Sequence, residues 1–331
     1  MTSVRLTRIL ASTAIAFAAL AVPLQPAQAQ DPAANYPNKP MRLIVPFAAG
    51  GGNDIFARLV ATKAAEYLGQ QFVIENRAAA GGRPAAEFVT NQPADGYTVF
   101  IAASGPMSIA SAVYPKLAYH PTKSFTPLSM IANFPLIMVS PVQNPAKTVR
   151  ELVDFGKANP NKSNYATTSP AFTISSELLK LKTGMPGVAI PLKSSAEMIL
   201  CVIQENCLFA ISDGPPAIPQ IKAGKVRALA VTGAERSAEL PDVPSMSEAG
   251  YPEVNTKLWS GFFVSAKTPP AIAAKLEAAF RRAITDAGVT AKLKEMAVNP
   301  GGGTGQEFRK MIDADIQNYV SVVKAANLKF Q

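Results

Sequence analysis

Residues 45–59, VPFAAGGGNDIFARL, are the stretch from which the fold of the chain is best interpreted. The apolar residues 41–46 predict a short buried strand that ends at Pro46. The three glycines at 50–52 predict a tight turn, and Asn53-Asp54 begins a segment with helical spacing. Backbone N–H groups at such a helix start are unpaired and suit a phosphate or a carboxylate. The alternative is a plain tight connection between strand and helix.

The apolar spacing of this helix predicts that Ile55, Leu59 and Val60 line its buried face. The glycine spacing fits neither the dinucleotide-binding fingerprint nor the P-loop. No Lys-Ser or Lys-Thr pair follows the glycines, and Asp54 would repel a nearby phosphate.

The first 29 residues have the three parts of a secretory signal peptide. Arg5 and Arg8 precede an apolar run at 9–22, and Ala27-Gln28-Ala29 gives a small-x-small cleavage pattern. No other stretch approaches the roughly 20 apolar residues that cross a bilayer. We therefore expect an exported protein, located in the periplasm if the cell is a Gram-negative bacterium.

The charge of the chain is positive but dispersed. Removing the two arginines of the signal peptide lowers the formal charge from +9 to +7. Lysine and arginine are spread along the sequence without a basic cluster interleaved with aromatic residues, which argues against nucleic-acid binding. A positive surface is compatible with anionic solutes or lipid headgroups and selects neither. About 300 mature residues predict two domains.

Cysteine and histidine are scarce, which limits the possible chemistry. Cys201 and Cys207 are close enough in sequence to form a disulfide in an oxidising compartment, and the alternative is two buried free thiols. The single histidine, His120, lies between Tyr119 and Pro121 in a turn pattern, where a surface loop position is expected. One histidine in such a context disfavours most metal sites and a Ser-His-Asp triad, and no cofactor or metal is expected.

Short apolar runs alternate with helical patterns along the chain, which predicts parallel strands with helices on both faces of a sheet. The strands expected at 71–75 and 97–102 also end in small-residue loops, at 76–82 and 104–106. These loops should meet the loop at 46–52, because ligand-binding loops of open α/β sheets gather at the carboxyl edge.

The pattern is repeated in the second half with a different sequence. Apolar runs at 128–139 and 258–265 predict strands that cross between two lobes, and 270–287 predicts a long amphipathic helix. A capping box at Thr148 and Glu151 starts another helix, and Thr173 is a candidate cap for the helix at 175–182. Two similar α/β lobes joined by two crossings describe a hinged clamshell with a ligand cleft.

The divisions predicted from this pattern are a signal peptide at 1–29, a first lobe formed by 30–136 plus 260–331, and a second lobe at 137–259.

A series of short segments along almost the whole mature chain resembles the tripartite tricarboxylate transporter substrate-binding proteins, the Bug (Bordetella uptake gene) family. The segments are Tyr36-Pro37 with Pro40, Val45-Pro46-Phe47 with Gly50-Gly51-Gly52 and Asp54, Glu75-Asn76-Arg77 with Gly81-Gly82, Asp95-Gly96-Tyr97-Thr98, Tyr114-Pro115-Lys116-Leu117, Pro219-Gln220-Ile221-Lys222-Ala223-Gly224-Lys225 with Arg227-Ala228-Leu229-Ala230-Val231-Thr232, and Pro241-Asp242-Val243-Pro244 with Glu248-Ala249-Gly250-Tyr251-Pro252. Each segment is weak alone, and their number and order make the resemblance specific.

The resemblance implies an α/β, periplasmic-binding-protein-like (type II) two-lobe clamshell with two crossing strands as its hinge. It implies a periplasmic receptor that captures an organic carboxylate and delivers it to the membrane permease subunits of a tripartite tricarboxylate transporter. A monomer without enzymatic activity is expected. The positions that match the family's carboxylate-binding loops are Phe47, Ala48, Ala49, Gly52, Asn53, Asp54, Ser104, Thr167, Thr168 and Ser169, with Asp213 on the cleft wall.

Two of these loops depart from the family pattern. Family members often carry Thr-His and a nearby Asn after the third strand, where this chain has Pro106, Met107 and Ala110. The second-lobe loop is usually glycine-rich, and here it contains Phe172 and is about two residues shorter. Met107 and Phe172 could contact the apolar body of a ligand. We therefore expect an aromatic or otherwise apolar carboxylate.

Each side chain also has an ordinary structural interpretation. Phe47 and Phe172 are equally suited to core packing, and Thr167 and Thr168 could cap the next helix. Asp213 could cap the proline-rich turn that follows it. Trp259, the single tryptophan, is expected to pack at the hinge.

Two other functions compete with a transport receptor. A secreted hydrolase is disfavoured, because the sequence lacks a Gly-x-Ser-x-Gly elbow and His120 has a poor context. A binding protein that presents its ligand to a membrane sensor kinase would use the same clamshell, and the sequence does not separate this role from transport.

Overall fold

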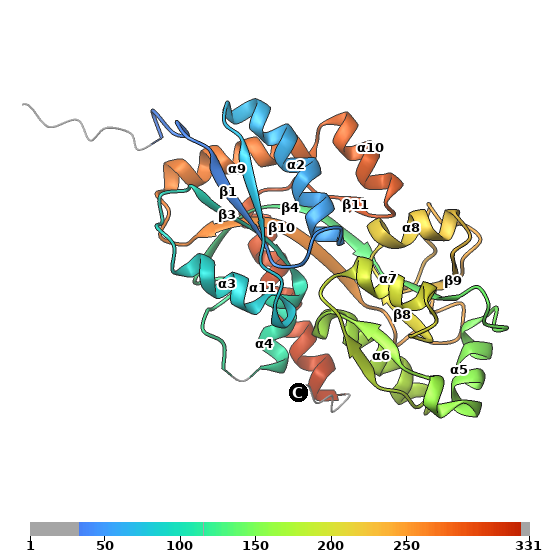
Figure 1. Cartoon of the computed structure of the whole chain (residues 1–331). Coiled ribbons are helices and arrows are strands. Elements are labelled where there is room, and N and C mark those ends of the chain that lie inside the picture. The colour runs from blue at the N-terminus through green and yellow to red at the C-terminus, as the bar shows by residue number, and fades with distance from the viewer. Residues whose placement is uncertain (1–32, 115, 326–331) are drawn as a thin grey trace, which may run out of the picture.

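The computed structural model describes residues 33–114 and 116–325, so the predicted signal peptide lies outside the described residues. The described strands form two separate sheets, one of six strands and one of five (Figure 1). We call the six-stranded sheet with its helices the first lobe, and the five-stranded sheet with its helices the second lobe. The predicted α/β two-lobe architecture is confirmed.

The first sheet has the strand order β11-β4-β10-β3-β1-β2. In this sheet β1 pairs in parallel with β2 and β3, whereas β10 runs antiparallel to β3 and β4. Its strands are β1 (Met41–Val45), β2 (Phe72–Asn76), β3 (Thr98–Ala103), β4 (Phe125–Pro135), β10 (Lys257–Ser265) and β11 (Asn299–Pro300). Its helical segments are α2 (Gly52–Leu68), η2 (Ala80–Gly82), α3 (Arg83–Thr90), η3 (Gly105–Ile109), α4 (Ala110–Val113), α9 (Pro270–Ile284), α10 (Ala287–Glu295) and α11 (Gly305–Ala325).

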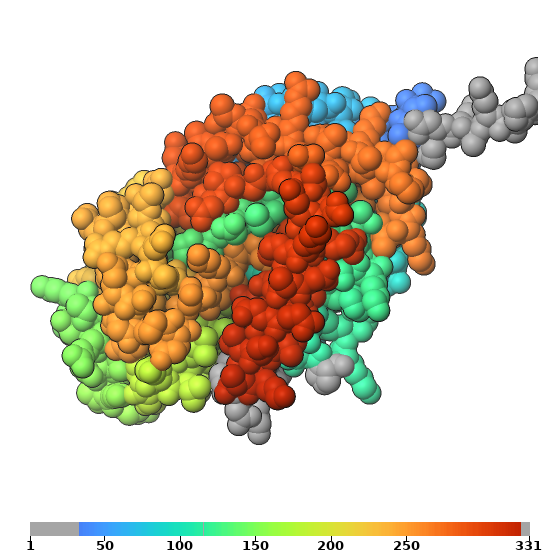
Figure 2. All heavy atoms as spheres, turned by 180° about the vertical axis from the view of Figure 1, so that it is seen from behind, coloured from blue at the N-terminus to red at the C-terminus, as the bar shows by residue number. Residues whose placement is uncertain are grey.

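Alternate residues of β1 enter different hydrophobic cores on the two faces of this sheet. Leu43 and Val45 pack in the core that includes Phe56 of α2, whereas Ile44 packs in the core that includes Phe308 of α11. Successive side chains of a strand point to opposite faces, so helices on both faces require the continuous apolar run seen in the sequence. Figure 2 shows α11 lying along the back of the molecule.

The buried face of α2 differs from the predicted face by about one position. Val60 is fully buried as predicted, but Phe56 and Ala57 are also fully buried, whereas Ile55 and Leu59 are only partly buried. The helix is rotated so that the bulky ring of Phe56, four residues before Val60, faces the sheet.

The second sheet has the strand order β7-β6-β8-β5-β9, with β6 parallel to β7 and β8, and β5 antiparallel to β8 and β9. Its strands are β5 (Ile137–Pro141), β6 (Tyr165–Thr167), β7 (Ala189–Pro191), β8 (Phe209–Ser212) and β9 (Val226–Val231). Its helical segments are α5 (Val149–Ala158), η4 (Pro160–Lys162), α6 (Pro170–Thr183), α7 (Ser195–Ile203) and α8 (Gly214–Lys222). The predicted cap of α5 is present, because Thr148 Oγ1 accepts a hydrogen bond of 3.2 Å from Glu151 N–H.

The chain passes between the lobes twice. At the first crossing β4 and β5 are separated by Leu136, where the prediction divides the lobes. The chain returns to the first lobe between β9 and β10, because β10 pairs with β3 and β4 of the first sheet from Lys257 onward. The strand predicted at 258–265 thus lies within the first sheet, and the predicted lobe boundary at 259 stays a prediction.

Thr232 connects the two crossings. Its Oγ1 accepts a hydrogen bond from Leu136 N–H (2.7 Å) and donates one to Thr256 O (2.6 Å), and its own N–H donates to Leu136 O (2.7 Å). The side chain is fully buried, so these bonds are shielded from water. The hinge is thus stabilised by a residue that the sequence did not identify.

Two predicted helix boundaries are wrong. The helix predicted at 270–287 ends at Ile284, and α10 begins after Asp286, whose carboxylate accepts from the N–H groups of Gly288 and Val289. Thr173 is not a cap, because α6 already begins at Pro170. A local Asp cap and a Pro at the first helical position override the apolar periodicity.

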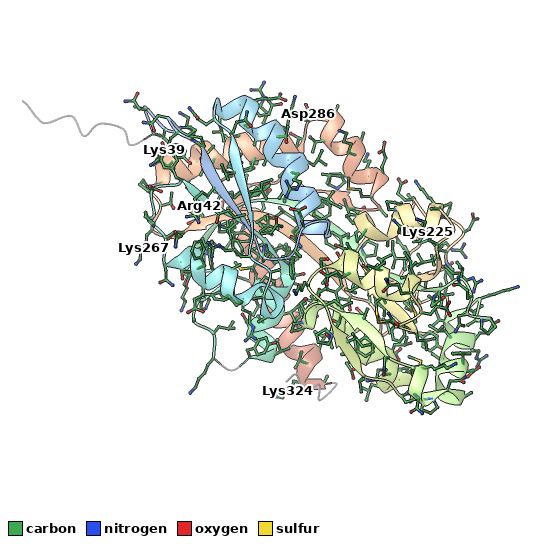
Figure 3. The ribbon with its side chains drawn as sticks, viewed as in Figure 1. Lys39, Arg42, Lys225, Lys267, Asp286 and Lys324 are labelled. Atoms are coloured by element: carbon green, nitrogen blue, oxygen red, sulfur yellow. A yellow bond between two sulfur atoms is a disulfide. The ribbon has the colours of Figure 1, made fainter. Side chains whose placement is uncertain are left out.

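The basic residues are dispersed over both lobes. Figure 3 shows Lys39, Lys267 and Lys324 on the first lobe at separate places on the outline, and Lys225 on the second lobe. Within residues 33–114 and 116–325, none of the helices has the length and apolar character needed to cross a membrane.

Candidate ligand-binding site

The glycine loop between β1 and α2 lies against the second lobe. Ala48 N–H donates to Lys193 O (3.3 Å), and Gly52 N–H lies 3.4 Å from Ser195 Oγ. A Cβ atom on Gly52 would lie 2.0 Å from Asp213 Oδ2, so no side chain fits there with the lobes in this arrangement. Glycine is required at 52 because it permits close approach between lobes, and at 50 because φ is +81°.

Asp54 stabilises this loop from within the first lobe. Its carboxylate accepts two 3.0 Å bonds from Arg58 and further 3.0 Å bonds from Gly50 N–H and Asn76 Nδ2. Burial raises the pKa of Asp54, but these hydrogen bonds together hold it below its usual value. The side chain therefore holds the loop through protein donors, and the predicted contact of Asp54 with a ligand stays a prediction.

Asp213 is a buried carboxylate at the contact between the lobes. It precedes α8 and receives hydrogen bonds from Gly52 N–H, Ser195 and Ser212, the last at 3.3 Å. Burial raises the pKa of Asp213 to about 6, although these bonds oppose the shift. The predicted position of Asp213 on the cleft wall agrees with this contact, and the alternative role as a side-chain cap does not, because Asp213 makes no cap bond to α8.

Asn53 and Ser104 lie together on the first-lobe side. Asn53 Oδ1 accepts a 2.9 Å hydrogen bond from Ser260 Oγ, and Ser104 Oγ lies 3.5 Å from Trp259 N. All of these polar side chains are buried. Ser260 belongs to β10 and was missed by the sequence analysis, because its neighbours in sequence form an ordinary apolar strand.

The second-lobe loop after β6 supplies hydroxyl groups without protein partners. Thr167 Oγ1 donates to Ser169 O (3.2 Å) and lies 2.8 Å from Thr173 Oγ1. Thr168 Oγ1 and Ser169 Oγ are buried and have no hydrogen-bond partner within the described residues. A buried polar atom without a partner is costly, so these two hydroxyls are candidates to bind a ligand.

Ser169 also lies at the contact between the lobes. A Cβ on Gly81 would lie 3.2 Å from Ser169 Cβ, and a Cβ on Gly105 would lie 3.4 Å from Ser169 Oγ. Gly81 and Gly105 follow β2 and β3, so the structure brings all three predicted first-lobe loops to the second lobe. Ser104, next to Gly105, is part of the same group.

The apolar candidates have different environments. Phe47 is buried yet belongs to neither hydrophobic core cluster, and its carbonyl accepts from Asn76 Nδ2 (2.9 Å). Met107 packs in the first-lobe core with Trp259, and Phe172 packs in the other large core cluster. Ala49 is exposed at the loop. Of the three large apolar candidates, Phe47 alone lies outside the cores, which removes most of the structural support for an apolar wall formed by Met107 and Phe172.

A cavity of about 660 Å³ lies between the lobes beside Ser169. Its second-lobe wall includes Thr167, Thr168 and Ser169 from the predicted set. The other lining residues are Ala80, Gly81, Arg83, Tyr114, Tyr165, Pro170, Thr173, Glu177, Lys180, Gly187, Val188, Ala189 and Pro191. This volume is in the range of small-molecule sites. Arg83 could have been found in the sequence, since it follows Gly81-Gly82 at the predicted sheet edge, whereas Glu177 and Lys180 carry no such signal.

The remaining predicted residues lie away from this cavity. Cys201 and Cys207 form a disulfide that links the end of α7 to the segment before β8. His120 is exposed in a loop, where Nδ1 accepts from Thr122 N–H and Lys123 N–H. Trp259 packs in the first-lobe core, and its indole N–H donates to Asp315 Oδ2 (2.8 Å).

Comparison with known proteins places this geometry in a family. Residues 56–328 match the family described as the tripartite tricarboxylate transporter family receptor. The chain is 30% identical to Protein BugT of Bordetella pertussis, over 98% of this chain and 99% of BugT. The structure is also similar to that of R. palustris Rpa4515 with adipate, with 33% identity, a TM-score of 0.85, and coverage of 89% of this chain and 99% of that chain. A further similar structure is MatC (Rpa3494) from Rhodopseudomonas palustris with bound malate, with 29% identity, a TM-score of 0.83, and coverage of 87% and 100%.

Proposed function

Because the chain belongs to the tripartite tricarboxylate transporter receptor family, we propose that it captures an organic carboxylate between its two lobes and delivers it to membrane permease subunits. The observation that carries this proposal is the pair of unpartnered buried hydroxyls, Thr168 Oγ1 and Ser169 Oγ, in a cavity lined by both lobes. Hydroxyl donors that have no protein acceptor can hold the oxygen atoms of a carboxylate.

The loops of the two lobes would act together in this capture. The first-lobe loop at 46–52 is held in place by Asp54 and approaches the second lobe through Gly52. Ligand contacts supplied by both lobes stabilise the arrangement in which the lobes touch, because a ligand shifts a conformational equilibrium by its differential affinity. Thr232 would serve as the hinge connection between the crossings.

Adipate and malate are both aliphatic acids, so the similarity to the proteins that bind them supports a carboxylate ligand and gives no support to an aromatic body. An aromatic or apolar body stays a prediction, and Phe47 is the large apolar candidate outside the two cores that supports it. We also propose that the protein acts in the periplasm as a monomer after removal of residues 1–29, and that it releases its ligand chemically unchanged.

The proposed function is tested by purifying the mature protein under native conditions and identifying released small molecules by mass spectrometry. Isothermal titration calorimetry then measures the affinity for the identified acid. A carboxylic acid recovered unchanged after prolonged incubation is the expected result. Binding of no acid, or conversion of the acid to a product, would contradict the proposal.

A further inference from the structure

Asp213 is a second-lobe carboxylate that the first lobe covers from two sides. A Cβ atom on Gly52, at the start of α2, would lie 2.0 Å from Asp213 Oδ2. A Cβ atom on Gly214, the residue after Asp213, would lie 2.0 Å from Met296 O at the end of α10. Both α2 and α10 belong to the first lobe, so separation of the lobes uncovers the carboxylate. With the lobes in contact, Asp213 is only 2% exposed.

This buried carboxylate has no cationic partner. Among residues 33–114 and 116–325, no Lys, Arg or His lies within ion-pair distance of Asp213. Its hydrogen bonds come from Ser195, Ser212 and Gly52 N–H, which are neutral donors. Burial of an ionised carboxylate without a cation is costly, and neutral donors offset only part of that cost. The two serine hydroxyls can also accept from a protonated carboxyl group, because a hydroxyl both donates and accepts.

The titratable groups on the surrounding elements are engaged elsewhere or exposed. Those nearest in sequence to the contact are Asp54 and Arg58 of α2, Lys193 and Glu197 at the start of α7, Lys222 of α8, and Lys294 and Glu295 of α10. Burial raises the pKa of Asp54, but its bonds to Arg58 and other donors hold it below its usual value, so Asp54 stays ionised above pH 5. Glu197 accepts from Lys193 N–H (3.1 Å), and the side chains from α8 and α10 are exposed.

The cost of burial makes the contact between the lobes sensitive to pH. Burial raises the pKa of Asp213 to about 6, whereas an aspartate in water has a pKa of about 3.9. The arrangement with the lobes in contact therefore binds more protons in this range than the arrangement with the lobes apart. A state that binds more protons is favoured as the pH falls, so acidification from pH 8 toward pH 5 favours the contact.

From this arrangement we propose that Asp213 takes up a proton when the lobes come together, so that acidic solution favours the capture of an acid. The new O–H bond forms on the Asp213 carboxylate, and the proton comes from water or buffer. The inference rests on the proposed function, because it requires that a bound acid brings the lobes together. Asp213 is not among the residues that line the inter-lobe cavity, so it acts on affinity through the arrangement of the lobes.

The test counts the protons that accompany binding. Titration calorimetry with succinate, malate, adipate and benzoate identifies an acid that wild type binds, and that acid is the probe. Titrations at pH 6 in two buffers of different ionisation enthalpy then give the number of protons taken up. Wild type should take up about half a proton more per bound acid than Asp213→Asn, because a group with a pKa of about 6 is half protonated there and an exposed aspartate is ionised.

Affinity gives a second measure of the same coupling. The ratio of the affinity at pH 5 to that at pH 8 should be about tenfold larger for wild type than for Asp213→Asn. The comparison between the two proteins cancels the titration of the probe itself and of His120, which both proteins share. Asp213→Ser also lacks a carboxylate and replaces Asp213→Asn if that variant does not fold.

Asp154→Asn is the matched control, since it makes the same chemical change to an exposed carboxylate of α5 in the same lobe. It should retain the proton uptake and the pH dependence of wild type. Thermal melting followed by circular dichroism verifies that each variant is folded.

Two kinds of result would overturn the inference. If wild type and Asp213→Asn take up equal numbers of protons, or if Asp154→Asn loses the uptake as well, Asp213 is not the coupled group and the proposed function still stands. If wild type binds none of the four acids at pH 5, 6 or 8, the proposed function fails and the inference with it.

Discussion

Gly52→Ala tests whether the contact between the glycine loop and the second lobe stabilises the arrangement seen in the structure. The added Cβ would lie 2.0 Å from Asp213 Oδ2 and 3.0 Å from Asp213 Cγ, at least 1.4 Å inside ordinary contact with the oxygen. Gly52 does not have a positive φ, so alanine is compatible with its backbone and with the start of α2. The substitution should therefore disfavour the contact between the lobes without disturbing the first lobe.

The size of the effect follows from the alternatives open to Asp213. The carboxylate is buried, and turning it away would break its bonds to Ser195 and Ser212. If it stays, the lobes must separate. Overpacking of this kind costs about 1–3 kcal/mol, which corresponds to roughly fivefold to 150-fold weaker ligand binding.

The assay is titration calorimetry with an acid that wild type binds, together with small-angle X-ray scattering at ligand saturation. Gly51→Ala is the matched control, since its Cβ would meet only ordinary contacts of 3.4–3.5 Å with Ser195, Ala48 and Ser194. Gly52→Ala should bind more weakly and retain a larger radius of gyration than Gly51→Ala. Equal affinity and equal radius for the two variants would refute the reasoning.

Three further predictions concern stability. Burial raises the pKa of Asp213 to about 6, so keeping this carboxyl group buried costs less free energy as the pH falls from 7 toward 4. Asp213→Asn should therefore be more stable than wild type by up to about 3 kcal/mol near pH 7, and by less toward pH 4. A difference in urea denaturation that does not change with pH would contradict this prediction. Trp259→Phe removes the indole donor from the half-buried carboxylate of Asp315, whose pKa is raised by burial. The variant should lower the unfolding free energy by about 0.5–1.5 kcal/mol in urea titrations, and an unchanged midpoint would show that the bond contributes nothing net. Replacing Cys201 and Cys207 by serine should lower the unfolding free energy by about 2 kcal/mol, as expected for a short disulfide loop. Reduction of wild type should lower it by the same amount, and a denaturation midpoint that reduction leaves unchanged would contradict the prediction.

The strand–turn–helix pattern at 45–59, together with the small-residue loops at 76–82 and 104–106, predicted which edge of the first sheet faces the cleft. Glycine tolerates close backbone approach, and the carboxyl ends of parallel strands share one edge, so three loops far apart in sequence could be placed together. The errors are local. The buried face of α2 was shifted because Phe56 takes the core position, and β10 was assigned to a crossing because strand periodicity does not reveal a partner strand.

The candidate site was predictable in part. Thr168, Ser169 and Asp213 lie at the contact between the lobes, and the sequence identified them through the loops that carry them. Met107 and Phe172 lie in cores, because an apolar residue beside a site has the same sequence signature as one that packs beneath it.

The sequence by itself therefore determined the two-lobe α/β class and the loops that face the cleft, because both depend on local periodicity and on glycines at fixed positions. It indicated the family through the number and order of short segments that resemble it. Tertiary structure alone decided which polar atoms find partners. Asp54 is satisfied within its own lobe, whereas the buried hydroxyls of Thr168 and Ser169 have no hydrogen-bond partner among the described residues. Hydrogen bonding and charge pairing depend on distances between segments far apart in the chain, and no local pattern encodes those distances.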